Sequence, residues 1–441
     1  MKLNASTQCI KIACLSSILL APLAHAENGE TSGLFEDSKM TLSTRNIAMY
    51  LDVDTNDDKD QFAWAQGVAI DYQSGYLADL IGFDATYEGA IKLDANDHFQ
   101  GRNLLRDNNG DAEGFNKMSQ MYLKAKLGDD EAYARVYLGW KQLHKLGAIT
   151  ISRSRAVTSS YQSISGEAGY QGLRLRGAYT DRFSDRDTPL KERFATLGGE
   201  KIDDIITGDV TYQWGKKNSV LVFSGQSRDY LRRSGLEFKW NTAVNENEKI
   251  KLSGYYYLNQ GLDKWEGIPF DDSASHYNLN LDYLFGGWTL GGSYAYTDAK
   301  RSNGLGIFYW DLGKNTDGNF NSRADGTGID FNKDGEQMVA FQAMYNMGKS
   351  GVPGLMIGAR ATYGFGMQYQ GLDLDEASLD MLAMYRFQAP ALKGLSMMLG
   401  VGPGYSYAMD GGMNPVIENG DWKKAPTIGA TFMLDYKFNL L

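Results

Sequence analysis

The C-terminal stretch TIGATFMLDYKFNLL, residues 427–441, alternates between large apolar side chains and smaller or polar ones. Every second position from Ile428 to Leu440 is apolar, and the positions between them include Gly429, Thr431, Asp435 and Lys437. Successive side chains of a β-strand point to opposite faces, so a period of two indicates a strand between two different surroundings. This alternation constrains the fold more than any other feature, because a helix would repeat its apolar residues every three to four positions.

The same period recurs along the chain, for example in FAWAQGVAIDY (62–72), IGFDATYEGAIKL (81–93) and WTLGGSYAY (288–296). Most of these segments have roughly ten residues, the length with which a tilted strand crosses the hydrocarbon layer of a membrane. Pro403 falls inside one of them, so the sequence does not fix the residue at which that strand ends. We predict 18 strands, near residues 39–51, 62–72, 76–93, 117–127, 132–141, 162–170, 173–183, 205–214, 219–228, 231–240, 249–258, 275–284, 288–297, 336–347, 355–365, 378–387, 395–406 and 427–440.

The links between these strands alternate in length. Short ones such as 73–75, 128–131 and 171–172 are followed by long ones such as 94–116, 142–161 and 298–335. Short turns on one side and long loops on the other are typical of outer-membrane barrels, in which the sheet closes so that every backbone polar group has a partner. We therefore predict an all-β, transmembrane antiparallel β-barrel of about 18 strands with short periplasmic turns, long extracellular loops and a water-filled lumen.

A soluble β-sandwich or propeller is the alternative. The small residues on the polar face and the aromatic residues near strand ends disfavour it, and no repeat of about 40–50 residues supports a propeller. No apolar run approaches the roughly 18 residues of a membrane helix.

Residues 1–26 have the features of a secretory signal peptide: Lys2 and Lys11, a short apolar core and the small residues of AHA before a cleavage point. Cys9 and Cys14 would leave with it, so we expect neither disulfides nor thiolate metal sites in the remaining single domain, residues 27–441. Loss of Lys2 and Lys11 would change the net charge from −10 to −12. An acidic chain of this kind is a poor candidate for binding nucleic acid.

Charged residues at the inward positions of the predicted strands would line the lumen. They have two interpretations: they pair with one another and stiffen the wall, or the cations of the fourth to seventh strands face acidic groups across the lumen and favour anionic solutes. The basic positions are Lys124, Lys126, Arg135, Lys141, Arg174, Arg176, Arg233, Lys239, Arg360 and Arg386, and the acidic ones are Asp84, Glu88, Glu167, Asp209, Glu237, Asp282, Asp380 and Asp435.

Three segments carry a resemblance to a known family: GLFEDSKMTL (33–42), WAQGVAIDYQSGYLADLIGFD (64–84) and residues 329–365, which contain IDFNKDGEQMVAFQAMYNM and VPGLMIGARATYGF. The chain resembles the OprD family of substrate-specific outer-membrane porins, and within it the chitoporin-like branch. The resemblance implies an 18-stranded barrel in the outer membrane of a Gram-negative cell, a third loop folded into the lumen, a ladder of basic residues and uptake of a small nutrient. It also implies contact with lipopolysaccharide and recognition of the C-terminal strand by the barrel assembly machinery.

The third loop, residues 142–161, carries Arg153 and Arg155, which we predict to lie at the constriction. The alternative is an external loop whose arginines bind lipopolysaccharide phosphates. For the chitoporin-like branch the implied solute is a chito-oligosaccharide, whose sugar rings pack on aromatic faces. This loop has no Trp, so the aromatic candidates are Phe308, Tyr309 and Trp310, together with Trp265 and Trp422, in predicted external loops or at the membrane boundary.

Two other functions stay open: a channel for small carboxylates or amino acids, and an adhesin or anchor without a channel. Both a monomer and a homotrimer are compatible with the sequence. We expect no enzyme and no cofactor, because the sequence has no Gly-x-Ser-x-Gly motif and its histidines outside the signal, His98, His144 and His276, lack metal-spaced partners. Loop 330–335 has the spacing of a calcium-binding loop, but Phe341 stands where an EF-hand needs Glu. Two interpretations of this loop and of residues 54–60 stay open: a bound Ca²⁺, or a solvated acidic loop.

Overall fold

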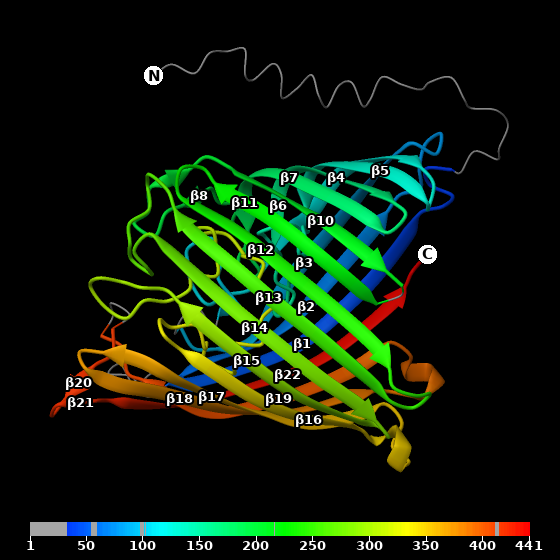
Figure 1. The fold of residues 1–441 in the computed structure, drawn as a ribbon. Helices are drawn as coiled ribbons and strands as arrows, with labels where there is room; N and C mark the ends of the chain where they lie inside the picture. Colours follow the sequence, from blue (N-terminus) through cyan, green and yellow to red (C-terminus); the bar gives the residue numbers. More distant parts are fainter. Residues whose placement is uncertain (1–32, 54–59, 98–100, 102, 216, 411–413) are drawn as a thin grey trace, which may run out of the picture.

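The computed structural model describes residues 33–441 except 54–59, 98–100, 102, 216 and 411–413, and the predicted signal peptide, residues 1–26, lies outside the described residues. Eighteen long strands form one antiparallel sheet that closes on itself as a barrel (Figure 1). These strands are β1 Lys39–Val53, β2 Gln61–Gln73, β3 Ile81–Ala95, β4 Phe115–Gly128, β5 Ala132–Lys141, β6 Ser160–Tyr170, β7 Leu173–Ser184, β10 Ile205–Trp214, β11 Asn218–Ser227, β12 Leu231–Ala243, β13 Lys249–Gly261, β14 Ser273–Phe285, β15 Trp288–Asp298, β16 Gln337–Asn346, β17 Leu355–Tyr369, β18 Leu372–Arg386, β19 Leu395–Tyr407 and β22 Lys424–Asn439.

Shorter elements lie in the links between these strands. Two hairpin fragments occupy loops, and two short 3₁₀ helices occupy turns at the end of the barrel where the C-terminus lies. Among the described residues, no helix is long and apolar enough to cross a membrane. The fragments are β8 Phe194–Ala195 with β9 Lys201–Ile202, and β20 Ile417–Glu418 with β21 Asp421–Trp422; the helices are η1 Met347–Ser350 and η2 Pro390–Leu392.

The barrel closes where the first strand meets the last. β1 pairs with β22 in a register that aligns Leu42 with Phe438 and Asn46 with Leu434, and its other edge pairs with β2. The alternating C-terminal stretch is therefore the closing strand, as expected from the need to pair every backbone polar group in lipid. The prediction of an 18-stranded barrel is confirmed, and each predicted strand overlaps one of the 18.

Two predicted strand starts are wrong by five residues or more: the sixteenth strand, predicted from residue 378, begins six residues earlier as β18 at Leu372, and the third begins five residues later than predicted. The third strand was predicted to begin at residue 76, but β3 begins at Ile81, because Ala78 and Asp79 adopt positive φ angles of 50° and 54° in a turn. Left-handed backbone of this kind ends a strand. The upper end of the strand that contains Pro403 is intact, and β19 continues to Tyr407.

The pairing of β19 with one of its two neighbours is interrupted near Pro403. β19 pairs with β22 without interruption through Pro403 and Ile428, whereas the pairing of β18 with β19 skips from Ser378–Gly404 to Met381–Val401. Proline has no backbone N–H to donate, so the ladder lacks one hydrogen bond at this position.

The outer wall of the barrel is apolar. Leu123, Leu175, Leu279 and Phe341 are exposed by 56, 55, 50 and 72% on this face, which a soluble protein would bury. Pairs of aromatic rings stack or pack near the turn end of the strands, as in Tyr212–Trp214, Tyr283–Phe285, Trp288–Tyr345 and Tyr436–Phe438. An apolar band with an aromatic girdle is the surface that fits a lipid bilayer.

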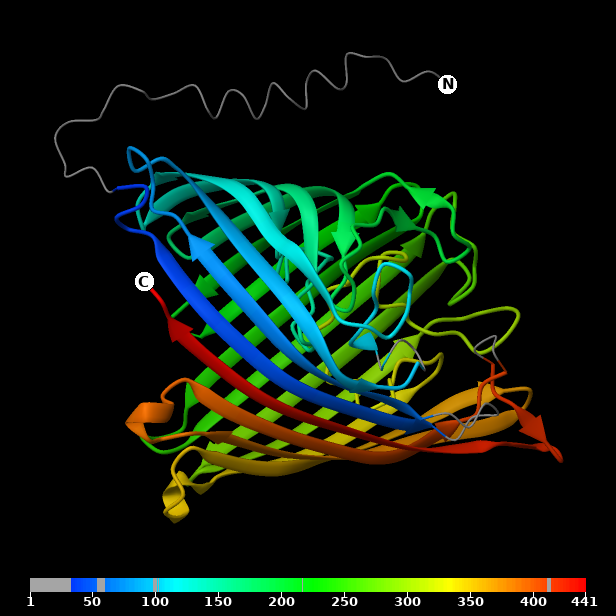
Figure 2. The ribbon, with the colours of Figure 1, turned by 180° about the vertical axis from the view of Figure 1, so that it is seen from behind.

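The long loops lie at the opposite end of the barrel from the start of β1 and the C-terminus. We name the three that matter below by their order along the chain: L3 is residues 142–159, L4 is 185–204 and L7 is 299–336. Three links at this same end, 54–60, 228–230 and 370–371, are no longer than the longest links at the other end, 347–354 and 387–394, so the predicted alternation of link lengths holds only for the remaining loops. Seen from behind, the barrel holds loop segments inside its wall (Figure 2).

Candidate functional site

L3 crosses the lumen and is fastened to several strands of the wall. Near its end, Thr158 donates from its amide and its hydroxyl to Glu88 of β3, at 3.1 and 2.9 Å. Near its start, the amide of Gly147 donates to Asp209 of β10 at 2.8 Å. Between these points Arg45 of β1 donates to the carbonyl of Arg153 at 2.5 Å. The prediction of an inward third loop is confirmed.

L7 runs beside L3 and extends the obstruction toward the other side of the barrel. The amide of Thr150 in L3 donates to the Asp317 carbonyl at 2.8 Å, and the amide of Asn319 donates to the Ala148 carbonyl at 2.8 Å. Farther along, Arg323 forms an ion pair of 2.6 Å with Asp282 of β14. L3 and L7 are therefore joined into one layer across the lumen, which we call the constriction.

The sequence predicted L7 only as a long external loop. Its length was the available signal, since loops longer than about 12–15 residues without secondary structure are usually functional or disordered. The sequence does not show which strands L7 contacts. The thirteen residues from Asp317 to Ile329 reach strands as far apart as β6 and β18. Tyr161 of β6 donates to the Asp317 carbonyl at 3.0 Å, and the Thr327 amide donates to Asp380 of β18 at 2.9 Å.

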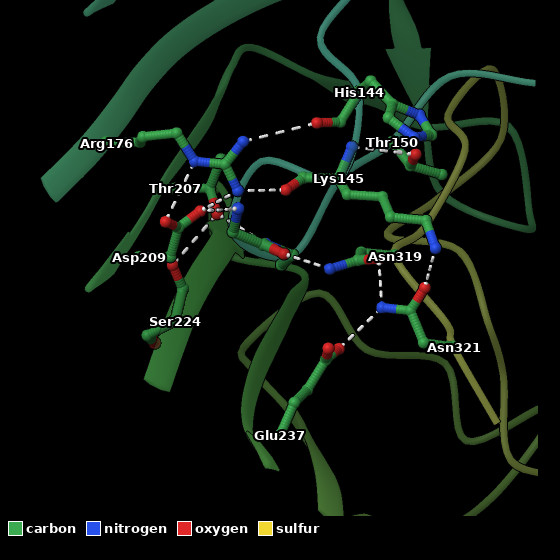
Figure 3. A network of polar contacts seen from close by, with 12 residues as sticks. His144, Lys145, Thr150, Arg176, Thr207, Asp209, Ser224, Glu237, Asn319 and Asn321 are labelled. Carbon is green, nitrogen blue, oxygen red and sulfur yellow. Dashed lines mark hydrogen bonds and ion pairs between the residues drawn. The ribbon is translucent and has the colours of Figure 1, made fainter. Parts of the chain in front are cut away.

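Figure 3 shows how the wall supports the constriction. Arg176 of β7 donates twice to Asp209, at 3.0 and 2.8 Å, and also to the carbonyls of His144 and Lys145. The Asp209 side chain has no exposed surface. The same carboxylate thus joins β7, β10 and L3, and it is satisfied by a guanidinium and a backbone amide together.

A second set of contacts joins L3 to L7 and to β12. The ammonium group of Lys145 donates to the side-chain oxygen of Asn321, and the amide of Asn321 donates to Glu237 at 2.7 Å (Figure 3). Lys145 has no carboxylate within ion-pair distance among the described residues. Burial and the charge of Lys239 lower the pKa of Lys145, against the opposing effect of Glu237.

Three of the four cations predicted on the fourth and fifth strands pair with carboxylates beside them. Their partners lie on the next strand or turn: Lys124 with Asp84 at 2.7 Å, Lys126 with Asp79 at 2.5 Å and Arg135 with Glu167 at 3.1 Å. Lys141 lies over the rings of Tyr122 and Tyr137, 4.2 Å from each centroid. These contacts fit the first of the two interpretations given above, in which charges pair along the wall. Such pairing weakens the electric field of these cations across the lumen.

Arg153 and Arg155, predicted together at the constriction, have different surroundings. Arg153 is exposed, and its guanidinium has no hydrogen bond or ion pair with any described residue. Arg155 is only 8% exposed and donates to the carbonyl of Asn103 at 2.9 Å. The expectation that both arginines line the passage is wrong for Arg155, because its side chain is directed into the packing beneath the loop. Glu88, predicted to line the lumen, is only 4% exposed and anchors L3.

The other predicted lumen residues are scattered. Arg360 pairs with Asp380 at 3.3 Å, and Arg174 lies on β7 two positions from Arg176 with no ion pair among the described residues. Arg386 is exposed at the turn end of β18, at the opposite end from L3 and L7. Lys126 and Arg174 also lie near this end, two residues before the end of β4 and one residue after the start of β7.

Trp310 lies within L7 and packs against its own loop. Its ring stacks on Phe320 with centroids 4.3 Å apart and planes 16° apart, and the neighbouring Phe308 is fully buried. The carbonyls of Tyr309 and Trp310 accept from the buried Arg233 of β12. The placement of these aromatic residues in an external loop or a membrane girdle is therefore wrong, because L7 folds inward and uses them as its core.

Sequence reasoning missed several residues of the constriction. Arg45 is on an inward position of β1, and the alternation could have identified it. Lys145, Asp317, Asn321 and Arg323 lie in irregular loops, where no period shows the direction of a side chain. In the loop with calcium-like spacing, Asn332 donates to the Phe308 carbonyl at 2.9 Å and Asp334 accepts from the Ala299 amide at 2.8 Å. The described residues include no group of three His, Cys, Asp or Glu that could hold a metal ion.

A closed barrel with an apolar outer wall and a polar lumen narrowed by two inward loops defines the class of outer-membrane diffusion channels. A family model described as "outer membrane porin, OprD family" matches residues 32–401, and the chain belongs to this family. It is accordingly a multi-pass protein of the outer membrane, in contact with the lipid and lipopolysaccharide there.

Known proteins agree with this assignment. Porin D of Pseudomonas aeruginosa is 24% identical over 357 residues, which are 75% of this chain and 74% of Porin D. The crystal structure of Acinetobacter baumannii OccAB1 matches with a TM-score of 0.78 and 17% identity over 95% of this chain and all of that one. Pseudomonas aeruginosa OccK8 (OprE) matches with a TM-score of 0.74 and 16% identity, covering 93% of this chain and 100% of that one.

Proposed function

We propose that this porin carries small solutes that bear a carboxylate, including amino acids. The observation that carries the proposal is an imbalance of free charge at the constriction. Lys145, Arg153 and Lys239 have no carboxylate partner among the described residues. The acids Asp209 and Asp282 there are held by Arg176 and Arg323, and the buried Glu237 accepts from Asn321 and Tyr257. Unpaired Lys and Arg along a pore favour anions.

The position of these cations supports the same reading. Arg153, Lys145 and Arg176 are close enough to His144 to lower its pKa, after the effect of burial. An anion that reaches L3 therefore meets several positive charges within a short path. Their combined potential would draw a carboxylate into the narrow part of the channel.

The proposal leaves chito-oligosaccharides, and with them the chitoporin-like branch, as a prediction that the resemblance alone supports. A sugar channel needs aromatic faces open to the lumen. Phe308 is fully buried, and Trp310 is half-buried against Phe320. A related fold has been crystallised with a small carboxylate: Pseudomonas aeruginosa OpdK with vanillate, at a TM-score of 0.71 and 16% identity over 92% of this chain and all of that one.

The test is electrical recording of the purified protein in planar bilayers. Under a KCl gradient the wild type should be anion-selective, and millimolar benzoate or glutamate should reduce its current more than millimolar chitohexaose does. The Arg153→Ala variant should lose part of the anion selectivity, whereas Arg386→Ala, which removes a cation at the far end of the barrel, should not. Cation selectivity in the wild type, or block by chitohexaose alone, would overturn the proposal. Absence of any conductance would favour the adhesin or anchor.

A further inference from the structure

Asp317 lies where the two loops of the constriction meet, and its side chain bonds to two separate points of L3. One of its carboxylate oxygens accepts from the hydroxyl of Ser159 at 2.6 Å and from the amide of Ser152 at 3.0 Å. Its backbone carbonyl accepts from the amide of Thr150 at 2.8 Å. One residue of L7 therefore holds three positions of L3, including the point at which L3 returns to β6.

The surroundings of this carboxyl group are apolar on one side. Ile149 and Tyr161 are fully buried, and Phe183 and Phe194 pack on the Tyr161 ring with centroids 4.7 and 6.3 Å away. These residues come from L3, β6, β7 and L4, so the junction of the loops is part of the largest buried cluster of the protein. Burial in such a place favours the neutral form of an acid.

The charged groups that face Asp317 do not neutralise it by direct pairing. From L4 come Asp185 and Arg186, from L7 comes Asp311, and from β4 comes Lys117. Arg186 donates to the hydroxyl of Ser152 at 2.6 Å, and Lys117 donates to the hydroxyl of Ser184 and the carbonyl of Asp185. Neither cation forms an ion pair with Asp317 within the described part of the chain.

The Asp311 carboxylate is likewise engaged, accepting from the amide of Gly318 at 2.8 Å. Burial first, and then the charge of Asp185, raise the pKa of Asp317 to about 7, against the opposing effects of Arg186 and of the hydrogen bond from Ser159. A carboxyl group that keeps its proton near neutral pH can still accept both bonds from L3 on its other oxygen.

We propose that Asp317 is the positioning residue of the constriction: its carboxyl group holds L3 against L7, and loss of its proton loosens this junction and widens the passage. The inference rests on the function of the protein as a channel and not on which solute it carries. The width of the passage then depends on pH between about 4 and about 7.

The direction of the pH dependence follows from the difference in the pKa of Asp317 between the closed and the loosened junction. In the closed junction Asp317 binds its proton more tightly than a solvated Asp, whose pKa is about 3.9. The closed state is therefore at its most stable at low pH, loses stability as pH rises between about 4 and about 7, and loses no more above that range. From pH 5.5 to pH 8 the equilibrium between closed and loosened junction should shift by roughly 30-fold toward the loosened one, the equivalent of about 1.5 pH units of titration.

The experiment is single-channel recording at pH 5.5 and pH 8. The wild type should show a larger open-channel conductance or more frequent transitions to it at pH 8. Asp317→Asn imitates the protonated acid and should give the low-pH behaviour at both values. The matched control is Asp263→Asn, at an exposed loop position, which should respond to pH as the wild type does. Equal behaviour of the wild type at both pH values, or the same pH response in Asp317→Asn, would overturn the proposal.

A second variant keeps Asp317 in place and so guards against misfolding of the first. Ala148 of L3 and Asn319 of L7 are adjacent across the junction, with the Asn319 amide bonded to the Ala148 carbonyl. Because the only cysteines of the sequence are Cys9 and Cys14, the pair Ala148→Cys and Asn319→Cys would introduce the only thiols into residues 27–441. Oxidised, this variant should lose the pH response, and dithiothreitol should restore it. A pH response that survives the crosslink would place its origin elsewhere, and absence of conductance in every variant would instead contradict the channel function.

Discussion

Arg45 of β1 and Asp435 of β22 form a two-point ion pair across the seam where the barrel closes, with Nε–Oδ1 at 2.6 Å and Nη2–Oδ2 at 3.0 Å. The same guanidinium donates to the carbonyls of Arg153 and Arg155 in L3, at 2.5 and 3.0 Å. One side chain therefore joins the closing strands to the constriction. L3 is held by Arg45 of β1 directly, and the ion pair with Asp435 of β22 is a separate contact of the same guanidinium.

Replacement of Arg45 by Met should release the middle of L3 while leaving the strand pairing of β1 intact. We expect a higher open-channel conductance and a loss of about 2 kcal/mol in the free energy of unfolding, since the partly exposed ion pair contributes up to about 1 kcal/mol and hydrogen bonds from a charged donor about 1.5 kcal/mol or more. The measurements are planar-bilayer conductance and urea unfolding in detergent.

Asp435→Asn separates the two roles of Arg45. It removes the ion pair but leaves the bonds to the loop carbonyls, so it should lower the stability slightly and leave the conductance near that of the wild type. If Asp435→Asn raises the conductance as much as Arg45→Met does, the bonds to the loop carbonyls are not what positions L3.

A second anchor of L3 is the contact of Thr158 with Glu88. In Thr158→Val the hydroxyl is lost, and a carboxylate that is 4% exposed keeps only the backbone amide of residue 158. An unsatisfied buried charge is costly, and we expect a loss of roughly 2–3 kcal/mol. Hydrogen exchange of amides 142–159 should be faster in this variant. Thr158→Ser retains the hydroxyl and should restore slow exchange; failure of that rescue would show that the methyl group, and not the bond to Glu88, fixes the loop.

Lys145 should make the anion selectivity depend on alkaline pH. Its pKa is lowered by burial and by Lys239, so its charge is lost below the range of about 10.4 that is usual for lysine. The anion-to-cation permeability ratio should therefore begin to fall at a lower pH than that at which an ordinary lysine loses its proton. Reversal potentials under a salt gradient measure this ratio.

Lys145→Gln provides the test of that assignment. It keeps a donor for Asn321 but has no charge, so its permeability ratio should be lower than that of the wild type at pH 7 and should fall less on going to pH 9.5. A fall as large as in the wild type would assign the effect to another group, with Lys239 the first candidate.

The sequence allowed the barrel to be predicted because lipid and water act on alternate residues of every strand. The strand β22 shows this directly: its apolar series faces lipid, and its Asp435 faces the lumen and pairs with Arg45. The constriction could be predicted only in part. Arg153 and Arg155 are two positions apart, yet one is exposed and the other buried, because the period of a strand does not apply to an irregular loop.

Contacts between distant parts of the chain were beyond sequence reasoning as well. Asp317 and its partner Ser159 are separated by 158 residues, and neither has a neighbour in sequence that indicates the other. The charge of Arg155 predicts a place in the passage, but its guanidinium instead donates to a backbone carbonyl of a neighbouring loop. The types of residue at the constriction were therefore predictable from strand positions, whereas the roles of loop residues were not.

The contact of Arg176 with Asp209 should be the most sensitive to a single deletion. Arg176→Ala leaves a carboxylate with no exposed surface and no cation, retaining only its bond to the amide of Gly147. Removing one partner of a buried ion pair costs roughly 3–5 kcal/mol, so urea unfolding should occur at a much lower concentration. Because Asp209 also holds the start of L3, the conductance of the folded fraction should become noisier.

The double variant Arg176→Ala with Asp209→Asn should recover most of this loss, because a neutral amide needs no counter-charge in the wall and can still accept from Gly147. The recovery is the decisive measurement, since a loss caused by missing van der Waals contacts of the long Arg176 side chain would persist in the double variant. If the double variant is as unstable as Arg176→Ala, the unpaired charge of Asp209 is not the cause. If it recovers stability but stays noisy, Arg176 also holds L3 through its bonds to the carbonyls of His144 and Lys145.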